Sequence, residues 1–436
     1  MSNLLIIWCL FLIQIFVING LELSNTYIWH LILCGIKIIC TINYVYLWFI
    51  LFIVIVLNLI VYCLIKKLIN FNKLHWILHL FGLISLTISL LIISYDIINY
   101  LVWFECLFFP IILVSLFYTF SNRFLFSIYY LLIFNASSSF LCIMLLCITL
   151  STWNLINITI LYINNINNNL LFYLLMWITL FIMFGIKYPI WPFHFWLPEL
   201  HVEVYTEMSI LLASLLLKAG FFGILKFLLF NALATNVFFT GIVETIILLG
   251  ILCIGLLIIC INDYKKIIAY WSIIHTCVGL LFVWMLDFLV ILILILTNLV
   301  HIVSSGYLFY IIGLLYECVG IRNFLLLNSN FNSNLYVYIL FYIILLNVDF
   351  PFMPLFIVEI LIIWIANFGN YQVLCVILWS NIIMFISSFL VFMWLTSLHL
   401  SWLSFIIKIS IGINEFFLIC NGLFIIGSLF FSVNMV

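Results

Sequence analysis

Apolar residues run through this chain in long, nearly continuous stretches separated by short polar connections. A helix needs about 20 such residues to cross ~30 Å of hydrocarbon, so stretches of this length are typical of transmembrane helices. A β-barrel is disfavoured, because barrel strands alternate apolar and polar positions over ~10 residues. The pattern predicts an all-α polytopic membrane protein of about fourteen transmembrane helices, at residues 3–20, 27–41, 45–64, 74–94, 97–118, 124–149, 170–188, 207–230, 237–261, 265–286, 288–313, 335–368, 371–396 and 414–433.

Basic residues between these stretches predict the orientation of the chain. If both termini lie on one face of the membrane, eight basic residues fall in connections on the opposite face and only Lys37 falls on the face of the termini. Because Lys and Arg concentrate in cytoplasmic loops, this partition predicts both termini on the outer face. The eight residues are Lys66, Lys67, Lys73, Arg123, Lys265, Lys266, Arg322 and Lys408.

Prolines predict where the helices break. Five of the six prolines form two clusters beside charges that lie inside apolar segments. Lys187 precedes Pro189, Pro192 and Pro198, whereas Glu359 follows Pro351 and Pro354. Proline cannot continue a helix, and interrupted helices at corresponding positions of two halves are typical of transporters built from inverted repeats. We therefore predict breaks at 187–198 and near 351–354.

Composition excludes a soluble globular domain, because 6% of the residues are charged and such a domain carries roughly a quarter. The 13 cysteines include no C-x-x-C pair and are interpreted as small buried hydrophobic residues. No glycine-rich nucleotide motif is present, so we expect no cofactor or metal in this chain. Residues 3–20 lack the basic start and cleavage site of a signal peptide and are expected to remain as a first span.

The charged residues that lie inside apolar segments include two acids, Glu105 and Glu359, and two lysines, Lys187 and Lys218. A charge at the bilayer centre costs at least ~2.5–3.5 kcal/mol, so each must face the bundle interior and have a partner or a water. We expect Glu105 to pair with Lys187 in space. Buried acids and bases on a shared polar path are suited to proton transfer, and two static ion pairs that hold the bundle together are the structural alternative.

Three histidines extend this polar set. His194, His275 and His301 lie in or beside apolar segments, and an imidazole can pass protons between its two nitrogens near neutral pH. For any one of them alone, a histidine that only packs in the core is the alternative interpretation.

Residues 187–203 (KYPIWPFHFWLPELHVE), followed by Lys218, resemble the signature of the chain 4 family of respiratory complex I, the NADH:ubiquinone oxidoreductase. Residues 263–275 (DYKKIIAYWSIIH) and the block from His301 to Arg322 agree in order and register, and the similarity covers roughly residues 97–395. The family's Ala-Pro pair after the H-V-E is replaced by Val204 and Tyr205.

The resemblance implies an antiporter-like subunit of the membrane arm, with two inverted-topology repeats of five helices and two discontinuous helices. It divides the chain into N-terminal transmembrane helices at 1–95, a proton-translocating core at 97–400 and a C-terminal transmembrane helix at 401–436. Its proton path would pass a gating pair, a central carrier and an exit carrier with histidines between them, and the residues at these positions are Glu105, Lys187, His194, Lys218, His275, His301 and Glu359.

The resemblance also implies that the chemistry of electron transfer lies elsewhere. NADH, FMN, iron–sulfur clusters and ubiquinone would be bound by other subunits, and this chain would carry no cofactor. Its partners would be other membrane-arm subunits, including neighbouring antiporter-like ones, and lipids, with no nucleic acid. The expected location is the mitochondrial inner membrane, with a bacterial membrane as the alternative.

Two other functions remain open from the sequence. A stand-alone or multi-subunit cation/proton antiporter would need further ion ligands near the lysines, where Glu207 is the nearest acid along the chain. A membrane scaffold that keeps the fold without pumping predicts loss of the buried charges, and all four are present.

Overall fold

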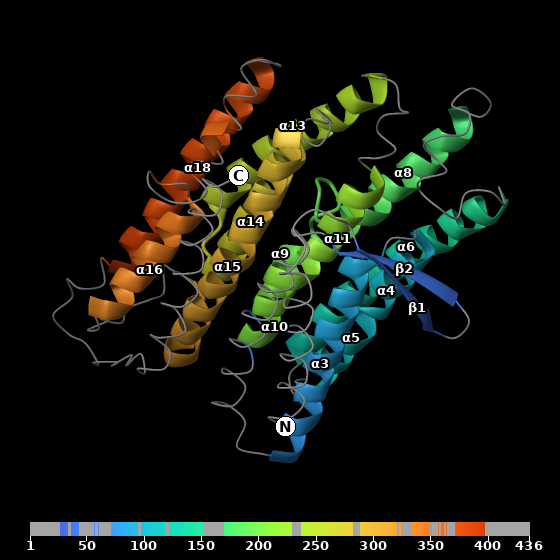
Figure 1. The fold of residues 1–436 in the computed structure, drawn as a ribbon. Helices are drawn as coiled ribbons and strands as arrows, with labels where there is room; N and C mark the ends of the chain where they lie inside the picture. Colours follow the sequence, from blue (N-terminus) through green and yellow to red (C-terminus); the bar gives the residue numbers. More distant parts are fainter. Residues whose placement is uncertain are drawn as a thin grey trace.

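The computed structural model describes residues 27–33, 36–42, 56, 60, 71–94, 97–117, 122–151, 170–228, 237–281, 288–320, 322–323, 334–348, 350, 356, 359–361, 363 and 371–396. The expected spans at 3–20 and 414–433, most of 45–64, and the proline cluster at 351–354 lie outside these residues. Figure 1 shows the described helices running side by side, with α3 to α6 towards one edge, α8 to α11 in the middle, and α16 and α18 at the other edge.

The helices of the first half follow the apolar segments closely. They are α3 (Phe71–Ile93), α4 (Ile97–Cys106), α5 (Phe108–Phe117), α6 (Asn122–Ser151) and α8 (Leu170–Lys187). A turn at Leu107 separates α4 from α5. Pro110 explains the interruption, because it has no N–H to donate to the carbonyl four residues earlier, at Cys106.

The second half consists of shorter helices followed by long ones. The short elements are α9 (Trp196–Glu203), α10 (Thr206–Leu211), the π-helical segment η1 (Leu212–Leu216), α11 (Leu217–Gly223) and the π-helical segment η2 (Ile224–Leu228). The long helices are α13 (Val237–Cys260), α14 (Tyr264–Leu281), α15 (Phe288–Val319), α16 (Asn334–Asn347) and α18 (Tyr371–Thr396).

Within the described residues, five apolar stretches of helix are long enough to cross a membrane, at Ile97–Val114, Thr206–Lys226, Gly241–Cys260, Ile295–Glu317 and Val373–Phe392. The chain is a helical, multi-pass membrane protein. The predicted number of fourteen spans is not confirmed by these residues.

The expected helix at 27–41 is wrong. Residues Tyr27–Leu33 (β1) and Ile36–Ile42 (β2) pair as antiparallel strands, with Tyr27 opposite Ile42 and Leu33 opposite Ile36. The segment is rich in β-branched isoleucine, which favours strands. Only Cys34 and Gly35 separate the strands in sequence, a spacing typical of a tight hairpin. The shortness of this apolar segment already indicated that it does not span the membrane, because its 15 residues are too few for a transmembrane helix.

The predicted break at 187–198 is present. Helix α8 ends at Lys187, turns occupy most of 188–195, and α9 begins at Trp196. Pro189 cannot donate to the carbonyl of Gly185, which instead accepts from the Ile190 N–H at 3.0 Å. The indole Nε1 of Trp196 donates to the carbonyl of Ile186 at 2.9 Å. These bonds satisfy carbonyls that the interrupted helix leaves without partners.

A second joint, between α9 and α10, persists without the proline found in the family. Val204 and Tyr205 have extended backbone, with φ −86° and ψ 149° at Val204 and φ −61° and ψ 159° at Tyr205. The φ of Tyr205 is close to the value that a proline ring imposes. The chain therefore reaches an extended conformation here without a proline.

Helix α15 lies at the centre of the second half. It packs against α14, α16, α10 and η1, so the segment that continues into α11 lies beside it. Gly220 of α11 allows the turn after α8 to come close, because a Cβ on Gly220 would lie 2.7 Å from the backbone nitrogen of Tyr188. These packings bring the broken helix and α15 together.

Candidate functional site

The first charged cluster joins α4 to the end of α8. Nζ of Lys187 lies 3.0 Å from Oε1 of Glu105, as expected from the sequence, and the lysine side chain is 2% exposed. The ammonium also donates to the Phe104 carbonyl at 3.3 Å and lies over the Phe104 ring, 3.6 Å from its centroid. Oγ of Ser138 on α6 donates to the same Glu105 oxygen at 3.4 Å. Three helices therefore converge on one ion pair.

Lys218 lies on α11, between the two π-helical segments, and its side chain is almost fully buried. Its Nζ is 3.0 Å from Oδ1 of Asn298 and 3.2 Å from Nδ1 of His301, both on α15. It forms no ion pair with any carboxylate among the described residues. A protonated lysine only donates, so Asn298 must present its oxygen and His301 must present an unprotonated Nδ1.

His275 of α14 continues this polar set from His301. The two imidazole centroids are 5.8 Å apart, and Nε2 of His275 lies 2.9 Å from the backbone oxygen of Asn347. A carbonyl only accepts, so Nε2 of His275 carries the hydrogen and Nδ1 of the neutral ring is free to accept a proton. Asn347 ends α16, and its carbonyl is among those that a helix end leaves without a helical partner.

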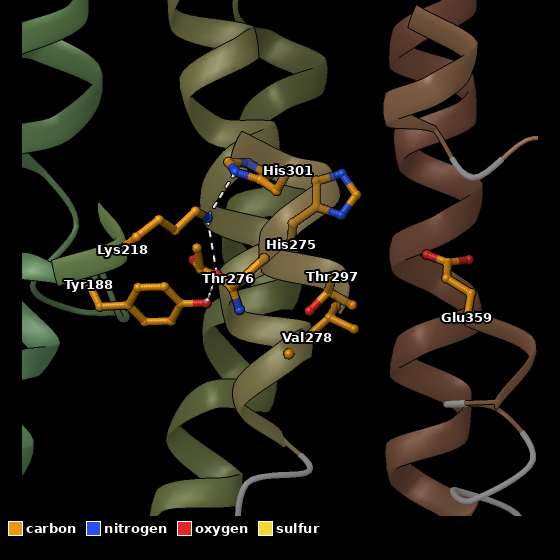
Figure 2. Close-up of a pocket in the computed structure, with 10 residues that line it drawn as sticks. Tyr188, Lys218, His275, Thr276, Val278, Thr297, His301 and Glu359 are labelled. Atoms are coloured by element: carbon orange, nitrogen blue, oxygen red, sulfur yellow. Dashed lines mark hydrogen bonds between the residues drawn. The ribbon is translucent and has the colours of Figure 1, made fainter. Parts of the chain in front are cut away.

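A small cavity lies beside these groups, and Figure 2 shows the side chains that line it. The cavity has a volume of about 20 Å³. It is lined by Lys218, His275, His301, Tyr188 and Glu359, among others. A buried water needs ~10–15 Å³ by this measure and two or more polar partners. The cavity therefore has room for about one water.

Glu359 is held from the opposite side by α18. Nδ2 of Asn381 donates to Oε2 of Glu359 at 2.5 Å, and Oγ of Ser380 donates to Oδ1 of Asn381 at 3.4 Å. Because an ionised carboxylate only accepts hydrogen bonds, the amide nitrogen of Asn381 faces it. The structure thus places Glu359 between the cavity and a polar position on α18.

His194 lies apart from the other predicted residues. It is fully buried between Phe195, at 4.3 Å between ring centroids, and Tyr270, at 6.2 Å. Neither ring nitrogen has a hydrogen-bond partner in the described part of the chain, and His194 does not line the cavity. Its position between Lys187 and Lys218 along a proton path remains a prediction.

Three residues of the site were not found from the sequence: Tyr188, Asn298 and Asn381. The hydroxyl of Tyr188 donates to Oδ1 of Asn298 at 3.3 Å. A signal was available for the two asparagines, because each interrupts a long apolar segment. Tyr188 gave no such signal, since tyrosines are common throughout the chain.

Comparison with known proteins places this geometry in a family context. Residues 94–383, about two thirds of the chain, match the family model described as NADH:quinone oxidoreductase/Mrp antiporter, TM. The chain is 32% identical over 271 residues to NADH-ubiquinone oxidoreductase chain 4 of Acanthamoeba castellanii, which covers 62% of this chain and 54% of that protein. Identity to the protein of the same name from Chondrus crispus is 39% over 142 residues, 33% of this chain and 29% of that protein. The matches span about half or less of these relatives.

Two solved structures share the fold at low sequence identity. A chain of the membrane-bound sulfane sulfur reductase, an archaeal respiratory membrane complex, superposes with a TM-score of 0.80 at 16% identity, covering 91% of this chain and 82% of that one. A chain of respiratory complex I from Thermus thermophilus with bound NADH gives 0.78 at 18% identity, covering 93% and 85%.

Proposed function

The chain belongs to the NADH:quinone oxidoreductase/Mrp antiporter transmembrane family, and from this membership we propose that it is a proton-translocating subunit of an NADH:ubiquinone oxidoreductase, equivalent to chain 4. The observation that carries the proposal is Lys218. It is a buried lysine whose ammonium contacts an imidazole nitrogen at 3.2 Å, in a cavity that a second imidazole and a carboxyl group also line.

The Glu105–Lys187 pair acts as a gate in the first half of the path. With both groups charged, the pair at 3.0 Å satisfies both. Protonation of Glu105 would remove the partner of Lys187 and leave a buried ammonium uncompensated, which favours release of its proton towards Lys218. A change of charge at the pair thus changes the electrostatic potential at Lys218.

The second half carries the proton from Lys218 to Glu359. Lys218 gives its proton to Nδ1 of His301, and that ring releases a proton from Nε2. Nδ1 of His275 receives it, directly or through a water in the cavity, while the Asn347 carbonyl holds the opposite nitrogen at 2.9 Å. Nδ1 of His275 then releases this proton, and Glu359, which lines the same cavity, accepts it for exit. His194 would serve the step between Lys187 and Lys218.

The wider setting of the chain forms part of the same proposal. The core at 97–400 would contain two inverted-topology repeats of five helices, flanked by transmembrane helices at 1–95 and 401–436. The chain would be a non-redox subunit, with NADH, FMN, iron–sulfur clusters and ubiquinone bound elsewhere in the complex. Its neighbours would be other membrane-arm subunits in the mitochondrial inner membrane. The chain 4 relatives support this location, and a bacterial membrane is the alternative, because a bacterial subunit M is also similar.

The test replaces Lys218 with methionine, which is similar in length and carries no titratable group. Lys218→Met should allow assembly, because the helix around it is apolar, and should remove most of the proton uptake that accompanies NADH oxidation in sealed vesicles. Lys266→Met, at a partly exposed ion pair with Glu199, is the matched control and should retain uptake. Normal uptake per NADH oxidised in Lys218→Met would refute the central-carrier assignment.

A cation/proton antiporter is the second candidate, because the family description covers both classes. A subunit of an NADH:ubiquinone oxidoreductase should purify with NADH dehydrogenase activity, whereas a separate antiporter should purify without it.

A further inference from the structure

Tyr188 and Asn298, which are not among the proposed proton carriers, form a hydrogen-bonded bridge to Lys218. The Tyr188 hydroxyl and the Lys218 ammonium donate to the same oxygen, Oδ1 of Asn298, at 3.3 and 3.0 Å. We propose that Tyr188 and Asn298 are positioning residues that hold the Lys218 ammonium at Nδ1 of His301, ready for proton transfer. This inference rests on the proposed role of Lys218 as a proton carrier.

The first argument comes from the two acceptors of Lys218 on α15. Asn298 and His301 are three residues apart, so their side chains project from the same face of the helix. Only the imidazole can accept a proton, whereas the amide can only accept a hydrogen bond. The contact at 3.0 Å to Asn298 therefore fixes where the ammonium lies, and the contact at 3.2 Å to His301 gives the direction in which its proton can leave.

The second argument is that Asn298 is itself held in place. The oxygen of an amide has two lone pairs, and the donors from Tyr188 and Lys218 use both. Because neither a phenol hydrogen nor an ammonium can be accepted by an amide nitrogen, these contacts fix which way the amide points. When Lys218 releases its proton, the bond from Tyr188 keeps the amide oxygen directed at the same place.

The third argument is the rigidity of Tyr188. Its side chain is 1% exposed, and its ring lies against that of Phe221 with 5.9 Å between centroids. The missing side chain of Gly220 leaves room for its backbone, and Pro189 restricts the chain immediately after it. A lysine has a flexible four-carbon stem, so a rigid tyrosine and a short asparagine provide the order that the lysine lacks.

The bridge also ties Lys218 to the first half of the path. Tyr188 follows Lys187 directly, at the end of α8. A displacement of this helix end, driven by a change of charge at the Glu105–Lys187 pair, would move the hydroxyl that holds Asn298. The position of the central carrier thus depends on the state of the gate through two hydrogen bonds.

The test uses the assembled complex in sealed vesicles, with proton uptake measured per NADH oxidised. Asn298→Leu keeps the size of the side chain and removes the acceptor, and it should lower the Lys218-dependent part of uptake by ~10-fold or more, since small misplacements of reacting groups can cost ~100-fold. Tyr188→Phe should lower it less. Tyr307→Phe removes a buried hydroxyl of α15 that does not line the described cavity, and it should keep uptake normal.

Asn298→Asp tests the role through the pH dependence of proton uptake, which should not change if Asn298 only packs against its neighbours. The carboxylate keeps an acceptor at the same place and adds a negative charge that holds the lysine proton more tightly, so the pH of maximal uptake should move upwards. The other titratable groups that line the cavity with Lys218 are His275, His301, Tyr188 and Glu359, and this substitution changes none of them. If Asn298→Leu fails to assemble, the pH profile of Asn298→Asp still tests the positioning role of Asn298.

The outcomes separate the inference from the function on which it rests. Normal uptake in assembled Asn298→Leu, or an unchanged pH profile in Asn298→Asp, overturns the positioning role while Lys218→Met still abolishes uptake. If Lys218→Met itself retains uptake, the proposed function fails and the inference fails with it.

Discussion

At the scale of single residues, Glu105 and Lys187 are paired where neither charge is well solvated. Their side chains are 23% and 2% exposed. Removing one partner of a buried pair costs ~3–5 kcal/mol, because the remaining charge is left uncompensated. Glu105→Gln and Lys187→Met should therefore each weaken the assembled complex, and the double variant should recover part of the loss. The measurement is a double-mutant cycle on the thermal stability of the complex.

Proton uptake should behave differently from stability in the same cycle. The double variant should not regain uptake, because the gate needs a titratable group whose protonation is coupled to that of its neighbour. Strictly additive stability costs would show that the two residues do not interact, and Glu207, which is buried on α10, would become the next acid to test.

At the scale of elements, the approach of the broken helix to α11 depends on Gly220. A Cβ at this position would lie 2.7 Å from the backbone nitrogen of Tyr188, which cannot move aside as a flexible side chain would. Gly220→Ala should destabilise the protein by ~1–3 kcal/mol, the usual cost of overpacking. It should also lower proton uptake, because it displaces the turn that carries Tyr188.

The matched control for this change is Gly82→Ala in α3. No atom lies within 4 Å of a Cβ built on Gly82, and alanine favours the helix by ~0.5–1 kcal/mol over glycine. Gly82→Ala should leave thermal stability equal or slightly raised. If Gly220→Ala were as well tolerated as Gly82→Ala, the close approach of the turn to α11 would not be needed for the site.

At the scale of the whole molecule, the question is which assembly contains the chain. Many large apolar side chains are exposed on the outer helices, Phe385 and Phe389 of α18 among them, and such surfaces face lipid or other membrane subunits. We expect the chain to co-migrate with NADH dehydrogenase activity when the native assembly is extracted in mild detergent and separated by size. Migration apart from that activity, with cation-dependent proton exchange, would favour the antiporter.

The sequence by itself determined the membrane class, the break after Lys187, the identity of the buried charges and the family resemblance. Each of these is a local property. The length of an apolar run decides whether a helix can span the bilayer, and a proline beyond the first turn of a helix removes a backbone donor and interrupts that helix. The pairing of Glu105 with Lys187 was also within reach, because a membrane interior offers a buried charge few partners.

The tertiary structure decided which of these groups meet. Asn298 accepts from Lys218, 80 residues away along the chain, and from Tyr188, 110 residues away. The local sequence around these residues does not show which of them meet. His275 and His301 line the cavity, whereas His194 does not. The pairing of β1 with β2 likewise replaced a helix expected from hydropathy. Contacts of this kind depend on the close fit of distant segments, which a one-dimensional pattern of apolar and polar residues does not contain.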